Sequence, residues 1–335
     1  MTQTHTYMHR ASRWLIAAGC ALALNMANAA LPTGEEVLAR VGVPQDQIAD
    51  LESGKAISWQ FKENSEKELA DGIAVYVAAP LAKVVGYIKK GNFAGLDTTL
   101  VAKGEIPDGA TVAAFKAFSL SAEEAQDLQE VEAGDKFNLS AEEIASFASL
   151  KGADKNAVTQ RYREILLQRY QAYRQSGLAG VAQYARDGAP ADPAAELRTA
   201  TERGSELIKS YSADLYEVWL NYPQALPADV SERFFWQSRN VEDRPTAALG
   251  HRLTRIADDG ALVLQRQYYV GHSYNSSQFV VGALPYHDGA LVFYALRSST
   301  DQVAGMGSGM KHSIGRDRMK AEMVKQLQRL RATLK

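Results

Sequence analysis

Two Asp-Gly turns restrict what the last third of this chain can fold into. Asp259-Gly260 and Asp288-Gly289 each stand between runs of β-branched, aliphatic and aromatic residues. A tight hairpin turn needs positive φ, which glycine adopts at little cost, so each turn is expected to join two adjacent antiparallel strands. With a further strand over 234–239 and a polar turn over 273–278, the pattern predicts an antiparallel meander of about five strands, a common sheet size.

A change of period after this region predicts one closing helix. Apolar residues recur at helical spacing and share one face, whereas the opposite face is basic. The apolar face consists of Met319, Met323, Leu327, Leu330 and Leu334, and the basic face of Arg318, Lys320, Lys325, Arg329 and Arg331. The predicted fold class is therefore α+β, with an antiparallel β-meander closed by a long C-terminal helix that covers one sheet face.

The start of the chain has the pattern of an export signal. An apolar run from Trp14 to Leu24 follows two arginines and ends in the small residues Ala27-Asn28-Ala29, which is typical of a signal peptide cleaved after Ala29. Lipoprotein processing at Cys20 is the alternative, which we favour less because Ala17 stands where that motif usually has leucine. We expect residues 1–29 to be a leader and the protein to be exported, with the bacterial periplasm as its destination.

Composition narrows the function classes. The chain has 335 residues and 1 cysteine, Cys20, so the part after the leader offers no thiolate or disulfide chemistry. Its 37 lysines and arginines are balanced by 39 acids, which gives no indication of nucleic-acid binding. No apolar run after the leader is long enough to span a bilayer. We expect a protein that does not span the membrane, binds no nucleic acid and carries no cofactor or metal.

The residues between the leader and the meander divide into an α/β part and a helical part. Strands are expected at 57–61, 72–79 and 111–118, with a helix opened by Pro80 between the second and the third. The predicted organisation is a signal peptide over 1–29, an N-terminal α/β part over 30–152, a helical pair over 153–222, and the sheet with its C-terminal helix over 223–335, which can form one composite domain with 30–152.

Side-chain caps mark the starts of the expected helices. Ser121 and Ser140 each open a Ser-x-x-Glu capping box, in which serine and glutamate bond each other's backbone N–H groups. Asp154 is placed to cap the first long helix. Asp192-Pro193 is placed to begin the second, which we expect to run to about Tyr222 as one helix.

Three strings of residues carry a resemblance to a known family. They are Ala172–Gly180, Arg266–Tyr274 and Arg297–Gly305, and together they resemble a family of exported bacterial proteins of unknown function. The resemblance implies export and a shared fold. The order of elements is also similar to that of START-like helix-grip proteins, which enclose a hydrophobic cavity between the sheet and the final helix. The helical segment 154–222 departs from that family and is read as an insertion.

Ser308 and Lys311 have the Ser-x-x-Lys spacing of penicillin-binding proteins and β-lactamases, and Ser273 and Asn275 have the Ser-x-Asn spacing. In that family Ser-x-x-Lys comes first, with most of the domain after it, and a Lys-Thr-Gly motif follows. Here Ser-x-x-Lys lies close to the last residue and Lys-Thr-Gly is missing. We therefore disfavour this interpretation.

A triad of Ser273, His272 and Asp301 is a second route to a nucleophile. No Gly-x-Ser-x-Gly elbow accompanies it, and the adjacent residues His272 and Ser273 would point to opposite faces if the strand continued through them. Any such hypothesis requires a serine within reach of a histidine or lysine.

Four histidines, His251, His272, His287 and His312, are chemically able to bind a metal, but their spacings match no compact zinc motif. The glycine-rich passage from Gly305 to Arg316 admits two interpretations. Converging N–H groups and nearby cations could bind an anion, or the glycines could let the chain turn tightly between the last strand and the last helix, which we favour.

Polar and aromatic residues of the meander are the candidate ligand contacts. Buried arginines need acceptors, from a structural ion pair or from a bound carboxylate or phosphate, and tyrosines offer an apolar face with a polar tip. The candidate binding residues are Arg266, Tyr268, His272, Tyr274, Asn275, Arg297, Asp301 and Lys311.

The leading functional hypothesis is an exported cell-envelope protein without catalytic activity, which binds a lipid or other amphiphile or serves as an accessory factor. We expect Tyr268, Phe293 and Met323 to line an apolar cavity between the sheet and the last helix. One alternative is a periplasmic hydrolase that uses a serine or histidine in 272–312. Another is a structural or protein-interaction role with an envelope protein as partner.

Overall fold

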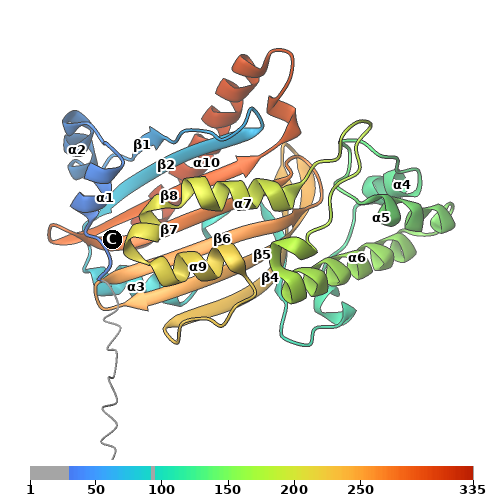
Figure 1. The fold of residues 1–335 in the computed structure, drawn as a ribbon, viewed down its shortest axis with the longest axis horizontal. Helices are drawn as coiled ribbons and strands as arrows, with labels where there is room; N and C mark the ends of the chain where they lie inside the picture. Colours follow the sequence, from blue (N-terminus) through green and yellow to red (C-terminus); the bar gives the residue numbers. More distant parts are fainter. Residues whose placement is uncertain (1–29, 92–94, 335) are drawn as a thin grey trace, which may run out of the picture.

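One eight-stranded antiparallel sheet organises the computed structural model, which describes residues 30–91 and 95–334 (Figure 1). The expected leader, with Cys20, lies outside these residues. The strand order across the sheet is β1-β2-β8-β7-β6-β5-β4-β3, so strands that come early in the chain form both edges. The strands are β1 Ile57–Gln60, β2 Glu68–Val77, β3 Leu100–Glu105, β4 Val230–Val241, β5 Arg244–Ala257, β6 Gly260–Val270, β7 Ser276–Tyr286 and β8 Gly289–Ser299.

The predicted meander is confirmed by strands β4 to β8, each paired antiparallel with the next. Both Asp-Gly turns lie at hairpin ends, where Gly260 has φ of 155° and His287 has φ of 50°. The chain between β6 and β7 turns over residues 271–275, and β7 begins at Ser276, inside the turn expected from the sequence.

Most helices before the meander cover one face of the sheet, which Figure 1 shows as its near side, with α7 and α9 lying over the strands. Their apolar side chains and those of the strands form two buried clusters on this face. These helices are α1 Gly34–Arg40, α2 Gln45–Glu52, α4 Ala122–Gln129, α5 Ala141–Phe147, α6 Lys155–Ser176, α7 Pro193–Gly204, α8 Glu206–Tyr211 and α9 Ala213–Asn221.

The opposite face is covered by α3 (Leu81–Lys89) and by the long α10 (Ser308–Leu334), which lies behind the sheet in Figure 1. The predicted apolar stripe of α10 is confirmed, because Met323, Leu327 and Leu330 are buried in the cluster on this face. The fold class is therefore α+β, an antiparallel meander closed by a long C-terminal helix in a helix-grip-like arrangement. None of the helices in the described part of the chain is both long and apolar enough to cross a membrane.

The predicted caps are also confirmed. Ser121 and Ser140 open capping boxes at the starts of α4 and α5, and the side chains of Asp154 and Asp192 accept hydrogen bonds from the first turns of α6 and α7. Pro193 occupies the first turn of α7, where its missing N–H would have had no partner.

Two predicted elements are wrong. The segment 111–118, expected as a strand, contains the 3-10 helix Val112–Phe115. Phe115 and Phe118 both enter the core at a spacing of three residues, which a strand would place on opposite faces. The helix expected from Pro193 to Tyr222 is divided into α7, α8 and α9 at Ser205 and Ser212, which are not helical.

Candidate functional site

A cavity of about 650 Å³ lies between the sheet and α10. Its floor consists of alternate residues of β4, β6, β7 and β8, and α10 forms the opposite wall. The cavity exists because α10 packs most extensively against β2, near one edge of the sheet, and leaves the inner surface of the strands toward β4 open.

One part of the cavity is apolar. Phe279 and Tyr294 meet edge to face with ring centroids 5.0 Å apart, and Leu296 lies beside Phe279 across the β7–β8 pair. Phe279 and Leu296 are only half-buried although α10 covers this face, because they border empty space. The facing side chains of α10 are Met319, Met323, Leu327 and Leu330.

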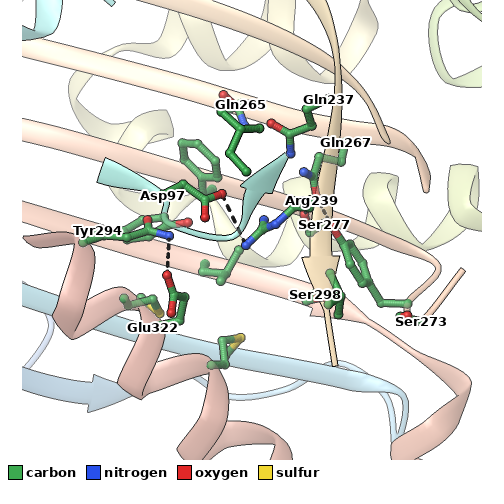
Figure 2. Close-up of a pocket in the computed structure, with 18 of the residues that line it drawn as sticks. Asp97, Gln237, Arg239, Gln265, Gln267, Ser273, Ser277, Tyr294, Ser298 and Glu322 are labelled. Carbon is green, nitrogen blue, oxygen red and sulfur yellow. Dashed lines mark hydrogen bonds and ion pairs between the residues drawn. The ribbon is translucent and has the colours of Figure 1, made fainter. Parts of the chain in front are cut away.

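The other part of the cavity is polar, at the ends of β4, β6, β7 and β8. Gln267 Oε1 accepts hydrogen bonds from Tyr274 Oη at 2.8 Å and from Ser277 Oγ at 2.6 Å. Figure 2 shows Ser273, Ser277 and Ser298 on one side of Arg239 and Asp97 on the other. The cavity therefore has an apolar region and a distinct region of hydrogen-bonding groups.

Arg239 is the central cation of this polar region. Its Nη2 lies 3.6 Å from Asp97 Oδ2, and its Nε donates to Thr99 Oγ1 at 3.3 Å. Burial works against its charge, but Tyr274 and Asp97 raise its pKa, so the guanidinium stays protonated at neutral pH. The ion pair with Asp97 is long, and a better-placed anion would compete for the guanidinium.

Arg252 on β5 adds a second cation. Its Nε donates to Gln265 Oε1 at 2.9 Å, and its guanidinium lies 5.2 Å from the centre of the Phe235 ring. Burial and the charge of Arg233 lower the pKa of Arg252 to about 10. The residues that line the cavity include more cations, Lys103, Arg233, Arg239, Arg252, Lys311 and Arg318, than anions, Asp97, Glu105, Glu242 and Glu322.

The structure brings two of the eight candidate residues, Tyr274 and Lys311, to this cavity. Tyr274 belongs to the polar region, and Lys311 is an exposed residue that donates to Ala304 O at 3.2 Å. Of the three residues expected to line an apolar cavity, Met323 does so, whereas Tyr268 and Phe293 face the other side of the sheet.

Arg266 and Tyr268 lie in the core between the sheet and the helices of the opposite face. The Tyr268 ring stacks on Tyr173 with centroids 3.9 Å apart. Arg266 is fully buried, donates to Tyr173 Oη at 3.2 Å and to Trp219 O at 3.0 Å, and lies 4.2 Å from the centre of the Trp219 ring. These contacts hold the helices on the sheet.

The remaining candidates take part in polar contacts outside the cavity. Arg297 pairs with Glu68 at 3.0 Å, so its acceptor is a structural ion pair within the chain. Asp301 binds Arg186 Nε at 3.0 Å and Lys67 Nζ at 2.8 Å. Asn275 Oδ1 accepts from Arg186 Nη2 at 3.2 Å.

His272 is buried in the turn after β6 and contacts Ser273. Its Nδ1 lies 2.7 Å from Ser273 Oγ. The strand does not continue through these neighbours, because β6 ends at Val270 and Ser273 has φ of 72°, so the alternation expected within a strand does not apply to them.

The glycine-rich passage before α10 is a turn. Gly305 and Gly307 have φ of 77° and 74°, which glycine adopts without strain. The cations nearby have acceptors within the chain: Arg316 Nε donates to Glu63 Oε1 at 2.8 Å, and Lys311 bonds the carbonyl of Ala304. These contacts support the turn interpretation that the sequence favoured over an anion site.

Within the described residues, no group of three or more histidine, cysteine, aspartate and glutamate side chains is arranged to hold a metal ion. His251 bonds Glu232, His287 lies beside Glu52, and His312 donates from Nε2 to Glu66 O at 2.6 Å.

Sequence reasoning missed Arg239, Arg252, Gln265, Gln267 and Asp97 as cavity residues. The signal was present in part, since Gln265 and Gln267 alternate within an otherwise apolar strand. Polar residues at every second position of a buried strand indicate that one of its faces is not packed against apolar groups. The role of Asp97 depends on the path of the loop before β3 and leaves no such signal.

No protein-family model matches this chain, and no curated protein matches it. Among solved structures, the di-domain ARO/CYC StfQ from the steffimycin biosynthetic pathway matches with 11% sequence identity and a TM-score of 0.26, over 78% of this chain and 97% of that chain. Because a TM-score this low does not define a shared fold, the class of this protein rests on its own sheet, helix and cavity. That class is a helix-grip-like α+β protein with a cavity able to hold a small ligand.

Proposed function

We propose that this chain is an exported binding protein of the cell envelope that holds an anionic, lipid-like amphiphile in the cavity under α10. The observation that carries the proposal is the division of one cavity of about 650 Å³ into an apolar and a cationic, hydrogen-bonding region. That volume lies within the range of about 300–1,000 Å³ usual for small-molecule sites. The leader expected from the sequence supports export, and a partner protein of the envelope stays a prediction.

The apolar region suits a hydrocarbon chain. Phe279, Leu296 and the methionines of α10 surround space that water alone would fill poorly, and transfer of alkyl groups into it is favourable by roughly 0.8 kcal/mol per CH₂. Methionine side chains adapt to ligands of differing length because they are unbranched and flexible.

The polar region suits an anionic head group. Arg239 presents a guanidinium whose carboxylate partner, Asp97, lies 3.6 Å away, and Gln267, Tyr274 and Ser277 offer donors and acceptors beside it. A carboxylate or phosphate that reaches Arg239 gains charge-assisted hydrogen bonds in a partly desolvated site. We place the head group there and the tail along α10.

The test is direct binding of dodecanoate and dodecyl phosphate to the intact purified protein. Binding is measured by calorimetry or by displacement of a fluorescent fatty acid. We expect saturable binding, and Arg239→Met should weaken it by at least about tenfold, the effect of losing one charge-assisted contact. Dodecanol, which has the same tail without the charge, should bind less tightly.

Arg233→Met is the matched control, since Arg233 lines the rim and its side chain is 53% exposed. Equal weakening by both substitutions would show a general effect of charge and would contradict the placement of the head group. Absence of saturable binding by any of these compounds would refute the proposed function.

A further inference from the structure

Ser273 and His272 form a hydrogen-bonded pair at the polar end of the cavity. The Ser273 Oγ–His272 Nδ1 distance is 2.7 Å, within the range expected for a nucleophile and its general base. Ser273 lines the cavity, whereas His272 is 98% buried behind it, with the Phe137 ring packed edge-on against the imidazole at 6.4 Å. Among serines of the cavity wall, Ser277 bonds Gln267 and Ser298 bonds Ser276 O instead.

The contacts of the imidazole fix its tautomer. His272 Nε2 lies 2.6 Å from the carbonyl oxygen of Pro245, which accepts hydrogen bonds only, so Nε2 carries the proton. Nδ1 is then the unprotonated nitrogen, which faces the Ser273 hydroxyl at 2.7 Å and the Thr246 hydroxyl at 3.2 Å, so Ser273 is the nearer donor. On the Nε2 side of the ring, Glu124 Oε1 lies 3.8 Å away and places a negative charge near the imidazole. In hydrolases with a serine nucleophile, the histidine base is likewise oriented by a hydrogen-bond acceptor on the ring nitrogen that does not face the serine.

The backbone at Ser273 also has the geometry of a functional turn. Its φ of 72° lies in the left-handed region, which is uncommon for residues other than glycine, asparagine and aspartate. Thr300 Oγ1 holds the turn by donating to the Ser273 carbonyl at 3.1 Å. Within the described residues, the N–H groups of Ser273 and Tyr274 make no hydrogen bond to another backbone group.

We infer that Ser273, with His272 as its base, is a nucleophile for carboxylic esters whose acyl chain lies in the cavity. Ser273 Oγ attacks the ester carbonyl carbon while His272 Nδ1 takes the hydroxyl proton. The bond to the alcohol oxygen then breaks, and the leaving alcohol receives that proton from His272. Water, deprotonated by His272, attacks the acyl-serine, the bond to Ser273 Oγ breaks with return of the proton, and a carboxylic acid is released. The substrate class rests on the proposed function, whereas the chemistry rests on the contact between Ser273 and His272.

An alkyl fluorophosphonate tests the nucleophile without requiring a known substrate, because it forms a covalent phosphonyl adduct with an activated serine. Intact-mass measurement should show one adduct per chain, and peptide mapping should place it on Ser273. Ser273→Gly removes the hydroxyl in a backbone conformation that glycine adopts freely, so the variant should fold and lose the adduct completely. Hydrolysis of p-nitrophenyl dodecanoate should disappear in the same variant.

Ser149→Ala is the control, since Ser149 is exposed, lies outside the cavity and bonds the carbonyl of Ser146 instead of a histidine, and it should keep both the adduct and the hydrolysis. A folded wild-type protein that forms no adduct, or an adduct that survives in Ser273→Gly, overturns the inference. If dodecanoate binds while no adduct forms, the proposed function stands and the nucleophile does not. If the adduct forms while no amphiphile binds, Ser273 is the nucleophile and the proposed function is wrong.

Discussion

His251 shows how a single buried side chain makes stability depend on pH. Its ring stacks on Phe234 with centroids 4.5 Å apart, its Nε2 bonds Glu232 Oε1 at 3.0 Å, and its Nδ1 faces Tyr173 Oη at 3.0 Å. Burial lowers the pKa of His251 to about 4, although the hydrogen bond to Glu232 works in the opposite direction. Arg266 and Arg174 face it as well and favour the neutral ring.

We predict that the free energy of unfolding falls as pH drops from about 6.5 toward 4. The folded-state pKa of His251 is depressed, so the unfolded chain takes up a proton that the folded chain does not, and the stability present above pH 6.5 is lost on acidification. One such group contributes a slope of at most about 1.4 kcal/mol per pH unit. Urea unfolding at pH 7.5, 6.5 and 5.5 measures it.

His251→Gln should reduce this slope, because glutamine keeps hydrogen-bonding groups and does not titrate. His287→Gln is the control, since His287 is 52% exposed in a hairpin turn, and it should leave the slope unchanged. An unaltered slope in His251→Gln would show that other groups cause the acid sensitivity.

At the scale of elements, Arg186 joins segments that are far apart in the sequence. It lies in the connection between α6 and α7 and bonds Asp301 after β8, Asn275 before β7, and Asn138 before α5. Its Nη1 also donates to the carbonyl of Gly134 at 2.9 Å. These bonds tie the helical layer to the end of the sheet beside which Ser273 lies.

We predict that Arg186→Met destabilises the protein by about 3 kcal/mol, because it leaves the carboxylate of Asp301 and several amide oxygens with fewer donors in a largely buried place. Arg198→Met, which removes an exposed helical ion pair with Glu202 at 3.9 Å, should cost less than about 0.5 kcal/mol. Urea unfolding compares the two variants. Hydrogen exchange should show faster opening of 134–140 in Arg186→Met, and equal costs would contradict the role assigned to Arg186.

The sequence predicts the hairpins, the closing helix and the capped helix starts because each depends on neighbouring residues: Asp-Gly at a turn, the apolar stripe ending at Leu334, or Ser121 with Glu124. The division of the cavity depends on register, which is a long-range property. Every residue of β6 is buried, so burial alone does not reveal that Tyr268 faces the helices and Gln267 the cavity. The contact of Ser273 with His272 likewise depends on where β6 ends, which the apolar pattern leaves open.

At the scale of the whole molecule, the sheet separates two unlike layers. One face is sealed by aromatic and aliphatic side chains of the strands and of helices such as α6, α7 and α9, and the other holds a cavity beside the apolar cluster of α3 and α10. Ligand binding is thus expected to depend on side chains that contribute little to the sealed layer.

Filling the cavity tests this separation. We predict that Leu296→Trp abolishes binding of dodecanoate while the free energy of unfolding changes by less than about 1.5 kcal/mol, because the larger ring enters space that no protein atom occupies. Ile314→Trp, at the exposed rim, should retain binding. Calorimetry and urea unfolding of both variants supply the measurements, and strong destabilisation by Leu296→Trp would show that the cavity is closed to larger side chains.

Because α10 packs mainly against β2, near one edge of the sheet, its apolar residues differ in what a substitution would change. Its apolar residues serve two purposes: Leu334 lies outside the cavity and packs the end of the helix on the sheet, while Met319 and Met323 border the cavity. Substitutions of Met319 or Met323 are expected to change the size and shape of the ligand that the cavity accepts, while Leu334 keeps the end of α10 on the sheet. Under the proposed function, single substitutions at these two positions are therefore expected to change which ligand is preferred.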